Sequence, residues 1–361
     1  MYVFDPRLAY AATPPASWYY EAAMLRDENR SVFGRTWQLV GQLESVASPG
    51  DYFTATVGGE PILVVRDREG VLRAMSNVCR HRAGPVASGS GNARAFRCGY
   101  HGWVYTLEGA LAATPEFEAV ECFDKSSNPL PSYKVDVWLG QIFVNLDPSA
   151  PPLRQVLGRL ADMVDESRYA GFRLAARKEW TVECNWKVYV DNYLEGYHIP
   201  VVHPGLAREI DYPNYRTETS GFFSIQHAPL KHPERIRTGA ESDAEAQFFW
   251  LFPNLMLNVY PDNFSTNVII PVTPTRTITL FDWYFKDPEA AEVKENLAST
   301  IEFSDEIQLE DIAICEAVQR GLESQSYSTG RYSVKRENGV HHFHGLLAEY
   351  LGADRGQHAR V

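Results

Sequence analysis

Two short stretches, Cys-Arg-His at residues 79–81 and Cys-Gly-Tyr-His at residues 98–101, decide which fold this sequence predicts. They supply two thiols and two imidazoles, separated by the 16 residues 82–97, which is enough to close one four-ligand site. The mixed set suits zinc, or an iron–sulfur cluster in which one iron takes both cysteines and the other both histidines. The candidate ligands are Cys79, His81, Cys98 and His101.

The sequence around these stretches predicts a small all-β domain. Short apolar or alternating runs are separated by turn signals such as Pro49-Gly50 and Gly58-Gly59. These runs lie at 52–57, 61–66, 71–75 and 141–145. Before them, residues 18–40 have the apolar spacing of a helix that leads up to the first strand.

A proline-rich joint at residues 148–152 follows the β domain, and we place a domain boundary near residue 150. Helical patterns at 153–169 and 289–321, the second with one break expected near Ser299, are combined with further β-rich runs. Those runs lie at 248–252, 256–260, 267–271 and 277–284. This order predicts an antiparallel sheet with long helices, so the whole chain is expected to be of the α+β class.

A second group of candidate ligands lies in residues 185–204. It contains His198 and His203, with Glu195 three residues before the first histidine. Five residues of unbroken α-helix differ by about 140° of rotation, so the two histidines need an interruption to share one metal. Pro200 supplies a reason for one, and we expect the helix to end near His198. The alternative is that both are packed or surface histidines.

A site with two histidines needs a carboxylate if it is to hold ferrous iron with open positions for dioxygen and substrate. On the predicted helix 301–322, an apolar stripe runs through Phe303, Ile307, Ile314 and Val318. Glu310 and Asp311 flank the centre of this stripe equally, at roughly 50°. Periodicity therefore does not choose between them.

Composition excludes several classes of protein. The 361 residues carry a formal net charge of −12, which opposes binding to nucleic acid or to an anionic membrane. The sequence shows no spanning apolar run and no signal pattern, so we expect a cytoplasmic protein that does not bind membranes. Five scattered cysteines do not resemble a disulfide framework.

The motifs resemble the ring-hydroxylating oxygenase alpha subunits that contain a Rieske domain. The similarity is carried by Cys-Arg-His-Arg at 79–82, Cys-Gly-Tyr-His-Gly-Trp-Val-Tyr at 98–105 and the segment with His198 and His203, and it extends over residues 33–322. It implies a Rieske [2Fe-2S] cluster held by the first four ligands, and a mononuclear Fe(II) held by His198, His203 and Asp311 in a helix-grip catalytic domain. The implied domains are an N-terminal helical segment (1–37) packing on the catalytic domain, the Rieske domain (38–150) and the catalytic domain (151–361).

The resemblance also implies roles and partners. Glu195 would hydrogen-bond His198 on one side and His101 of a neighbouring subunit on the other, in a homotrimer. The sequence has no convincing nicotinamide or flavin motif, so electrons would come from a separate NAD(P)H-dependent reductase of the flavin or ferredoxin type. The expected activity is a mono- or dioxygenase that uses O2 to hydroxylate or demethylate a small organic substrate.

The substrate expected from the sequence is either a quaternary ammonium compound, as in the choline, carnitine and betaine branch, or an aromatic acid. Six aromatic residues could form a cage for a quaternary ammonium, although sheet core is the favoured interpretation of each. They are Phe248, Phe249, Trp250, Tyr260, Trp283 and Tyr284. A non-enzymatic Rieske electron carrier and a zinc-stabilised binding protein are the alternatives from another class.

Overall fold

The computed structural model describes residues 2–231, 245–260 and 262–352, and these form two compact units. Asn29–Gln155 make up the first unit, and the rest of the described chain makes up the second. The divisions thus fall at 28/29 and 155/156, where the sequence predicts 37/38 and 150/151. Asn29 belongs to the first unit because its carbonyl packs against Gly34 and Gly58, leaving no room for a Cβ on Gly58.

The first unit is built from β-strands. Seven form an antiparallel sheet in the order β1-β10-β9-β4-β3-β2-β5, and three form a small sheet, β6-β7-β8. Their bounds are β1 Gln38–Gln42, β2 Asp51–Val57, β3 Glu60–Arg66, β4 Leu72–Ser76, β5 Ser90–Asn92, β6 Phe96–Arg97, β7 Val104–Tyr105, β8 Leu111–Ala113, β9 Ser132–Trp138 and β10 Gln141–Asn145. The four runs predicted here agree with β2, β3, β4 and β10 to within a residue.

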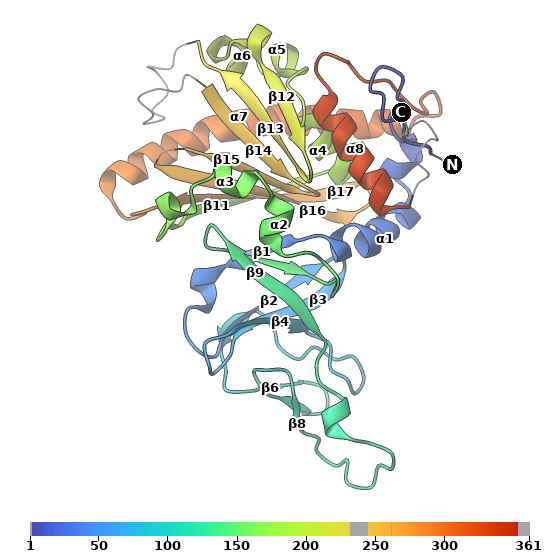
Figure 1. The fold of residues 1–361 in the computed structure, drawn as a ribbon, viewed down its shortest axis with the longest axis vertical. Helices are drawn as coiled ribbons and strands as arrows, with labels where there is room; N and C mark the ends of the chain where they lie inside the picture. Colours follow the sequence, from blue (N-terminus) through green and yellow to red (C-terminus); the bar gives the residue numbers. More distant parts are fainter. Residues whose placement is uncertain (1, 232–244, 261, 353–361) are drawn as a thin grey trace. The chain divides into compact units, whose positions relative to one another are not determined.

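The second unit contains one antiparallel sheet of seven strands in the order β11-β17-β16-β15-β14-β13-β12. The strands are β11 Arg173–Val182, β12 Arg216–Ser220, β13 Phe223–Pro229, β14 Glu245–Leu251, β15 Leu255–Val259, β16 Asn263–Thr273 and β17 Arg276–Phe285. Helix α7 (Ala291–Leu322) packs on α4 (Trp186–Tyr193) and β11, and it runs along one face of the sheet (Figure 1). Helix α8 (Asn338–Tyr350) packs on β12.

The remaining helices are short. They are η1 Ala16–Tyr19, α1 Ala22–Ser31, η2 Phe33–Arg35, η3 Leu43–Val46, η4 Lys125–Ser127, α2 Leu153–Leu157, α3 Leu160–Met163, η5 Glu166–Tyr169, α5 Ile199–Val202, α6 Leu206–Glu209 and η6 Tyr212–Asn214. In the described residues, no helix has the length and apolar character needed to cross a membrane.

Three helix predictions need correction. The helix expected over 18–40 ends at Ser31, and the single helix expected over 153–169 is split into three. Gly158, with a positive φ of 52°, separates α2 from α3, and the extended backbone of Val164 and Asp165 separates α3 from η5. The break expected near Ser299 is absent, and α7 is continuous. The hydroxyls of Ser299 and Thr300 both donate to the carbonyl of Asn296, so these polar side chains are satisfied within the helix.

A fully buried ion pair joins α1 to α4. Lys187 Nζ lies 2.5 Å from Glu28 Oε1, and neither side chain is exposed to solvent. Trp186 Nε1 donates to the other carboxylate oxygen at 2.8 Å. Burial raises the pKa of Glu28 and lowers the pKa of Lys187, and the attraction between the two charges opposes both shifts. Each charge therefore depends on the other to remain ionised inside the protein.

We predict that Lys187→Met destabilises the second unit by about 3–5 kcal/mol, because it leaves the Glu28 carboxylate buried without a counter-charge. Urea unfolding followed by circular dichroism measures the loss. The control is Arg7→Ala, which removes an exposed ion pair with Asp5 and is expected to cost at most about 1 kcal/mol. Equal stability losses in the two variants would contradict the prediction.

Candidate metal centres and the cavities beside them

The two histidines of residues 185–204 are brought together by a break in the helix. Helix α4 starts at the N-cap Asn185, whose side chain accepts from the amide of Lys187, and it ends at Tyr193. The helix thus ends before His198, earlier than the sequence predicts. The break occurs there because the Glu195 carboxylate accepts the backbone amides of Tyr197 and His198.

Pro200 has a different role from the predicted one. It occupies the first turn of α5, where a proline lacks only an amide that would have no helical partner. His198 is the N-cap residue of this short helix and His203 its C-cap residue. The helix therefore separates the two side chains by a single turn, and their ring centroids lie 5.0 Å apart.

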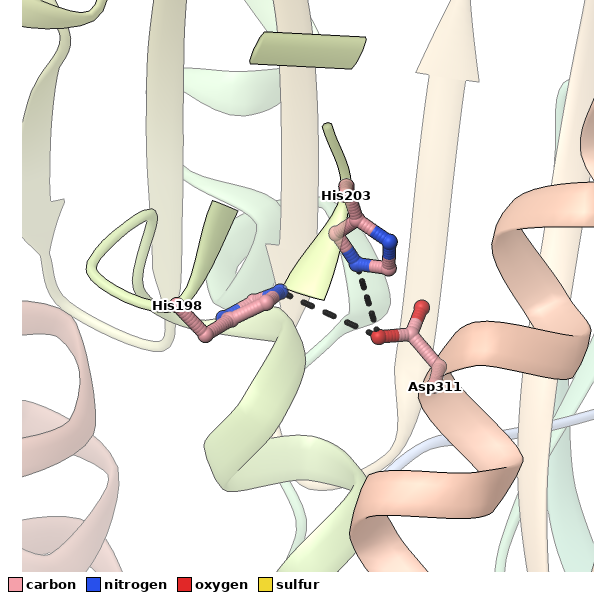
Figure 2. Close-up of side chains that lie close together, drawn as sticks. All are labelled: His198, His203 and Asp311. Carbon is pink, nitrogen blue, oxygen red and sulfur yellow. Dashed lines mark hydrogen bonds and ion pairs between the residues drawn. The ribbon is translucent and has the colours of Figure 1, made fainter. Parts of the chain in front are cut away.

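Asp311 on α7 completes a three-ligand cluster with these histidines (Figure 2). Its Oδ1 lies 3.0 Å from Nε2 of His203 and 3.8 Å from Nε2 of His198. One ligand atom from each residue falls within 4.8 Å of the others. Two imidazoles and one carboxylate on one face are the donor set of oxygen-activating ferrous sites, so these residues fit a mononuclear iron.

Each histidine is oriented by a further carboxylate. Nδ1 of His198 lies 2.7 Å from Oε1 of Glu195, and Nδ1 of His203 lies 2.6 Å from Oε2 of Glu310. A carboxylate only accepts, so Nδ1 carries a proton in each ring, and Nε2, which faces Asp311, is the nitrogen that would bind a metal. Both acids that flank the helix stripe therefore take part. Asp311 supplies a ligand oxygen, and Glu310 holds the proton on Nδ1 of His203.

Asn192 on α4 also contacts the cluster. Its Nδ2 donates to Asp311 Oδ1 at 2.7 Å. Burial lowers the pKa of His203, but hydrogen bonds and charges from Asp311 and Glu310 outweigh burial and raise the pKa overall. The sequence analysis did not identify the role of Asn192 as a donor to Asp311 or that of Glu310 as the acceptor from His203. The adjacency of Glu310 to Asp311 was the signal that could have revealed the second of them.

The four predicted ligands of the first unit lie on two tight loops. In the first, the amide of Cys79 donates to the carbonyl of Gly84, and in the second the amide of Cys98 donates to the carbonyl of Trp103. The loops meet, because a Cβ on Gly84 would come within 3.1 Å of Cys98 Sγ. Both thiols are buried, and the His81 and His101 rings have centroids 4.6 Å apart.

This donor set fits an iron–sulfur cluster. Nδ1 of His81 is buried and has no hydrogen-bond partner in the described part of the chain, as expected of a ligand atom. The Tyr105 hydroxyl lies 3.4 Å from Cys79 Sγ. Burial raises the pKa of Tyr105, so the phenol stays protonated and donates to a thiolate sulfur.

A cavity of about 260 Å³ lies beside the cluster formed by His198, His203 and Asp311. Eight aromatic side chains contribute to its lining, among amides and small hydroxyls: Tyr189, Tyr193, Tyr215, Phe248, Tyr260, Phe281, Trp283 and Phe303. Of the six aromatic residues considered from the sequence, Phe248, Tyr260 and Trp283 line this cavity. The other three are buried in the protein core. Trp283 is at the same time part of a buried hydrophobic cluster, so a residue of the sheet core can also line the cavity.

The apolar stripe of α7 faces cavities, so it does not lie in a packed core. Phe303 and Ile307 line the cavity beside the metal cluster, and Ile314 and Val318 line a second cavity behind it. Phe303 and Val318 are consequently 46% and 44% exposed. The most buried positions of α7 among the described residues are Leu297, Gln308, Cys315 and Gln319.

The two donor sets together define a class of protein. A buried pair of thiols with two imidazoles fits a cluster that carries electrons, and a separate set of two histidines and one carboxylate fits an iron that activates oxygen. This combination defines a Rieske non-haem iron oxygenase.

Comparisons with known proteins agree with this class. The model of the ring hydroxylating alpha subunit (catalytic domain) matches residues 170–353, and that of the Rieske [2Fe-2S] domain matches residues 36–124. The chain is 35% identical to chloroplastic choline monooxygenase of Arabidopsis thaliana, over 96% of this chain and 85% of that protein. It is 34% identical to the carnitine monooxygenase oxygenase subunit of Escherichia coli, over 94% of each.

A solved structure of the quaternary ammonium Rieske monooxygenase CntA in complex with L-carnitine aligns with a TM-score of 0.81 and 31% identity, over 95% of this chain and 97% of that chain. The chain belongs to the family of Rieske-type ring-hydroxylating oxygenase alpha subunits. Its cofactors are a Rieske [2Fe-2S] cluster and a mononuclear iron, and its family receives electrons from a separate reductase. The carrier and zinc-protein alternatives are not favoured.

We predict that Glu310→Gln weakens iron retention by about 10- to 100-fold, because a neutral amide no longer fixes the protonated Nδ1 of His203. Iron released to a ferrous chelator measures the change. Glu302→Gln, an exposed position on the same helix, is the matched control and should retain iron like the unchanged protein. Unchanged iron release in Glu310→Gln would contradict the assigned role.

A second prediction concerns the cluster in the first unit. Tyr105→Phe should lower its reduction potential by about 30–60 mV, because the lost hydrogen bond stabilised negative charge on the Cys79 sulfur. Redox titration followed by visible absorption measures the shift. Tyr133→Phe removes a hydroxyl bonded to Glu60 and should leave the potential unchanged. A shift of the same size in both variants would refute the prediction.

Proposed function

We propose that this protein is the terminal oxygenase component of a Rieske system that hydroxylates or demethylates a small quaternary ammonium compound. The observation that carries the proposal is the charge of the cavity beside the metal cluster. Its described lining includes the carboxylates of Glu195 and Asp311 but neither lysine nor arginine. The relatives named as choline and carnitine monooxygenases support the same substrate class.

The cavity suits a cation and disfavours an anion. A substrate carboxylate would lose its hydration and find no described cationic partner, which is costly in a largely apolar site. A trimethylammonium group instead benefits from aromatic faces, of which Trp283 offers the best. An aromatic acid is therefore the less favoured substrate. Among quaternary ammonium compounds, the cavity favours an uncharged polar end, such as the hydroxyl of choline.

In this mechanism the protein supplies ligands, orientation and a shaped cavity. Cys79, His81, Cys98 and His101 would hold the cluster, and His198, His203 and Asp311 would hold the iron. The cluster supplies single electrons and the iron supplies a place for dioxygen to be activated. Glu195 and Glu310 hold protons on Nδ1 of the two histidines, so that the Nε2 atoms keep their lone pairs.

Within the cavity, the aromatic lining binds the methylated end of the substrate and excludes water from it. Amide side chains, including Asn258 and Asn267, offer hydrogen bonds to the polar end. These contacts orient the C–H bond to be attacked, and the residues that make them would set the substrate specificity.

The partners proposed for this protein follow from its family. The reductase would be a separate NAD(P)H-dependent protein of the flavin or ferredoxin type. The chain would form a homotrimer in which Glu195 connects His198 to His101 of a neighbouring copy. A solved relative with 30% sequence identity is described as revealing inter-subunit electron transfer, which supports this arrangement.

We predict coupled NADH oxidation and oxygen uptake with choline, less with carnitine, and none with benzoate. The assay contains the holoprotein with a Rieske-oxygenase reductase, and product formation is followed by mass spectrometry. Turnover with benzoate but with no amine would overturn the substrate class.

Trp283→Leu should raise the KM for choline by about tenfold, because a cation–π contact of roughly 1–2 kcal/mol is lost. The matched control is a change of substrate. The uncharged isostere 3,3-dimethylbutan-1-ol has the same shape but no cation, so its binding should weaken much less, as measured by calorimetry. Equal weakening of both ligands would show that Trp283 contributes only shape.

A further inference from the structure

A second cavity, of about 350 Å³, lies behind the metal cluster in the second unit. It shares Asn192, Glu195 and His198 with the first cavity, so it reaches the metal site from another side. Its lining contains a group of buried or partly buried polar side chains that the mechanism above does not use. These are Tyr19, Asp191, Tyr332 and His344.

The four side chains form one continuous chain of hydrogen bonds. The Tyr332 hydroxyl lies 2.7 Å from Nδ1 of His344, and Nε2 of His344 lies 3.0 Å from the Tyr19 hydroxyl. The Tyr19 hydroxyl in turn donates to Oδ2 of Asp191 at 2.8 Å. The residues come from η1, α4, α8 and the segment before α8, and Tyr19, Tyr332 and His344 are buried.

The direction of every hydrogen bond follows from the carboxylate at one end. Asp191 only accepts, so Tyr19 uses its single proton as a donor to it. The Tyr19 oxygen then accepts from His344, which places the imidazole proton on Nε2. Nδ1 is consequently an acceptor, and Tyr332 donates to it. All the donors point the same way, toward Asp191 and the cavity.

Such a chain can pass a proton by shifting each hydrogen one place. Tyr332 gives its proton to Nδ1 of His344, His344 gives the proton on Nε2 to Tyr19, and Tyr19 gives its own proton to Asp191. The imidazole is then in its other tautomer, and a new proton replaces the one that Tyr332 gave up. At the other end, the Tyr332 hydroxyl lies beside the hydroxyl of the half-buried Tyr2 of the N-terminal segment, which in this structure donates to the carbonyl of Ala12. The chain therefore extends from near the surface to the cavity.

The cavity is suited to carry the proton onward. Oδ1 of Asp191 is buried and accepts no hydrogen bond from the described residues, although it lies 2.9 Å from Nε2 of His344. An unsatisfied carboxylate oxygen beside a polar cavity of this size is a site for ordered water. Burial also raises the pKa of Glu337, another carboxyl in the lining, which favours its protonated form.

We propose that Tyr332, His344, Tyr19 and Asp191 form a proton relay that supplies the oxygen-activating site through this cavity. An oxygenase takes up two electrons and two protons for each dioxygen. This holds whether one atom enters the substrate and the other leaves as water, or both atoms enter the substrate as hydroxyl groups. The electrons come through the cluster, and the protons come from water. Because substrate fills the first cavity, the second offers the protons a separate route. The proposal rests on the oxygenase activity alone, whatever the substrate.

The sharpest test is Tyr19→Phe, which removes one oxygen atom and with it the hydrogen-bonded path from His344 to Asp191; the direct approach of His344 Nε2 to Asp191 Oδ1, at 2.9 Å, lacks the geometry of a hydrogen bond. We expect kcat to fall by about tenfold or more, with an unchanged KM and a larger solvent deuterium isotope effect on kcat. Iron content and unfolding temperature should not change. The substrate is any compound that supports coupled oxygen uptake, so a failure of the choline assignment leaves this test intact.

His344→Gln is the second variant, because an amide can keep the hydrogen bonds but cannot take up and release a proton. His341→Gln is its control on the same helix, since the His341 ring packs on Tyr332, with 5.2 Å between centroids, but its Nε2 bonds the carbonyl of Asp5 and is not a link in the relay. We expect His344→Gln to reproduce the loss seen in Tyr19→Phe, and His341→Gln to retain full activity. A kcat for Tyr19→Phe within twofold of the unchanged protein overturns the relay. So does a loss accompanied by loss of iron, which would assign the group a structural role.

A readout independent of turnover is the water structure of the holoprotein. We expect a high-resolution crystal structure to show waters hydrogen-bonded in sequence from Asp191 to the side of Glu195. A dry cavity would overturn the proposal even if the variants were impaired.

Discussion

The imidazole of His203 lies between the carboxylates of two consecutive residues on α7, and the metal centre depends on this contact. Glu310 accepts from Nδ1 while Asp311 faces Nε2, so one turn of helix both orients the ring and supplies a ligand beside it. The positions of both carboxylates around His203 require that α7 stays fixed against α4. A hydrogen bond between Tyr189 and Gln308 and another from Asn192 to Asp311 hold the two helices together.

Negative charge dominates the site and supports the substrate class that we propose. Glu195, Glu310 and Asp311 surround two imidazoles, and the described lining of the adjacent cavity has no basic side chain. A divalent metal balances part of this charge, and a cationic substrate can balance more. A substrate carboxylate would add repulsion and an unpaired buried charge. The carboxylates that orient the ligands therefore also favour a quaternary ammonium compound.

Helix α7 serves two cavities with one apolar stripe. Its Phe303 and Ile307 face the cavity where we place the substrate, and Ile314 and Val318 face the one where we place the proton relay. The stripe has the periodicity of a core-facing helix, so sequence reasoning cannot tell a packed core from a cavity wall. Whether the opposite side of the stripe is filled by protein is decided by distant elements such as β17 and α8.

The sequence by itself predicted the fold class, the four candidate ligands of the first unit and the pair His198 and His203, because these ligands lie at short spacings and strands depend on local alternation. It identified His198 and His203 as neighbours across a helix break, although the break lies earlier than Pro200. Only the tertiary structure assigned separate positions to Glu310 and Asp311, joined Tyr19 to His344 across 325 residues and placed Trp283 in a cavity wall. These depend on how far-separated segments pack, and no local pattern encodes that packing.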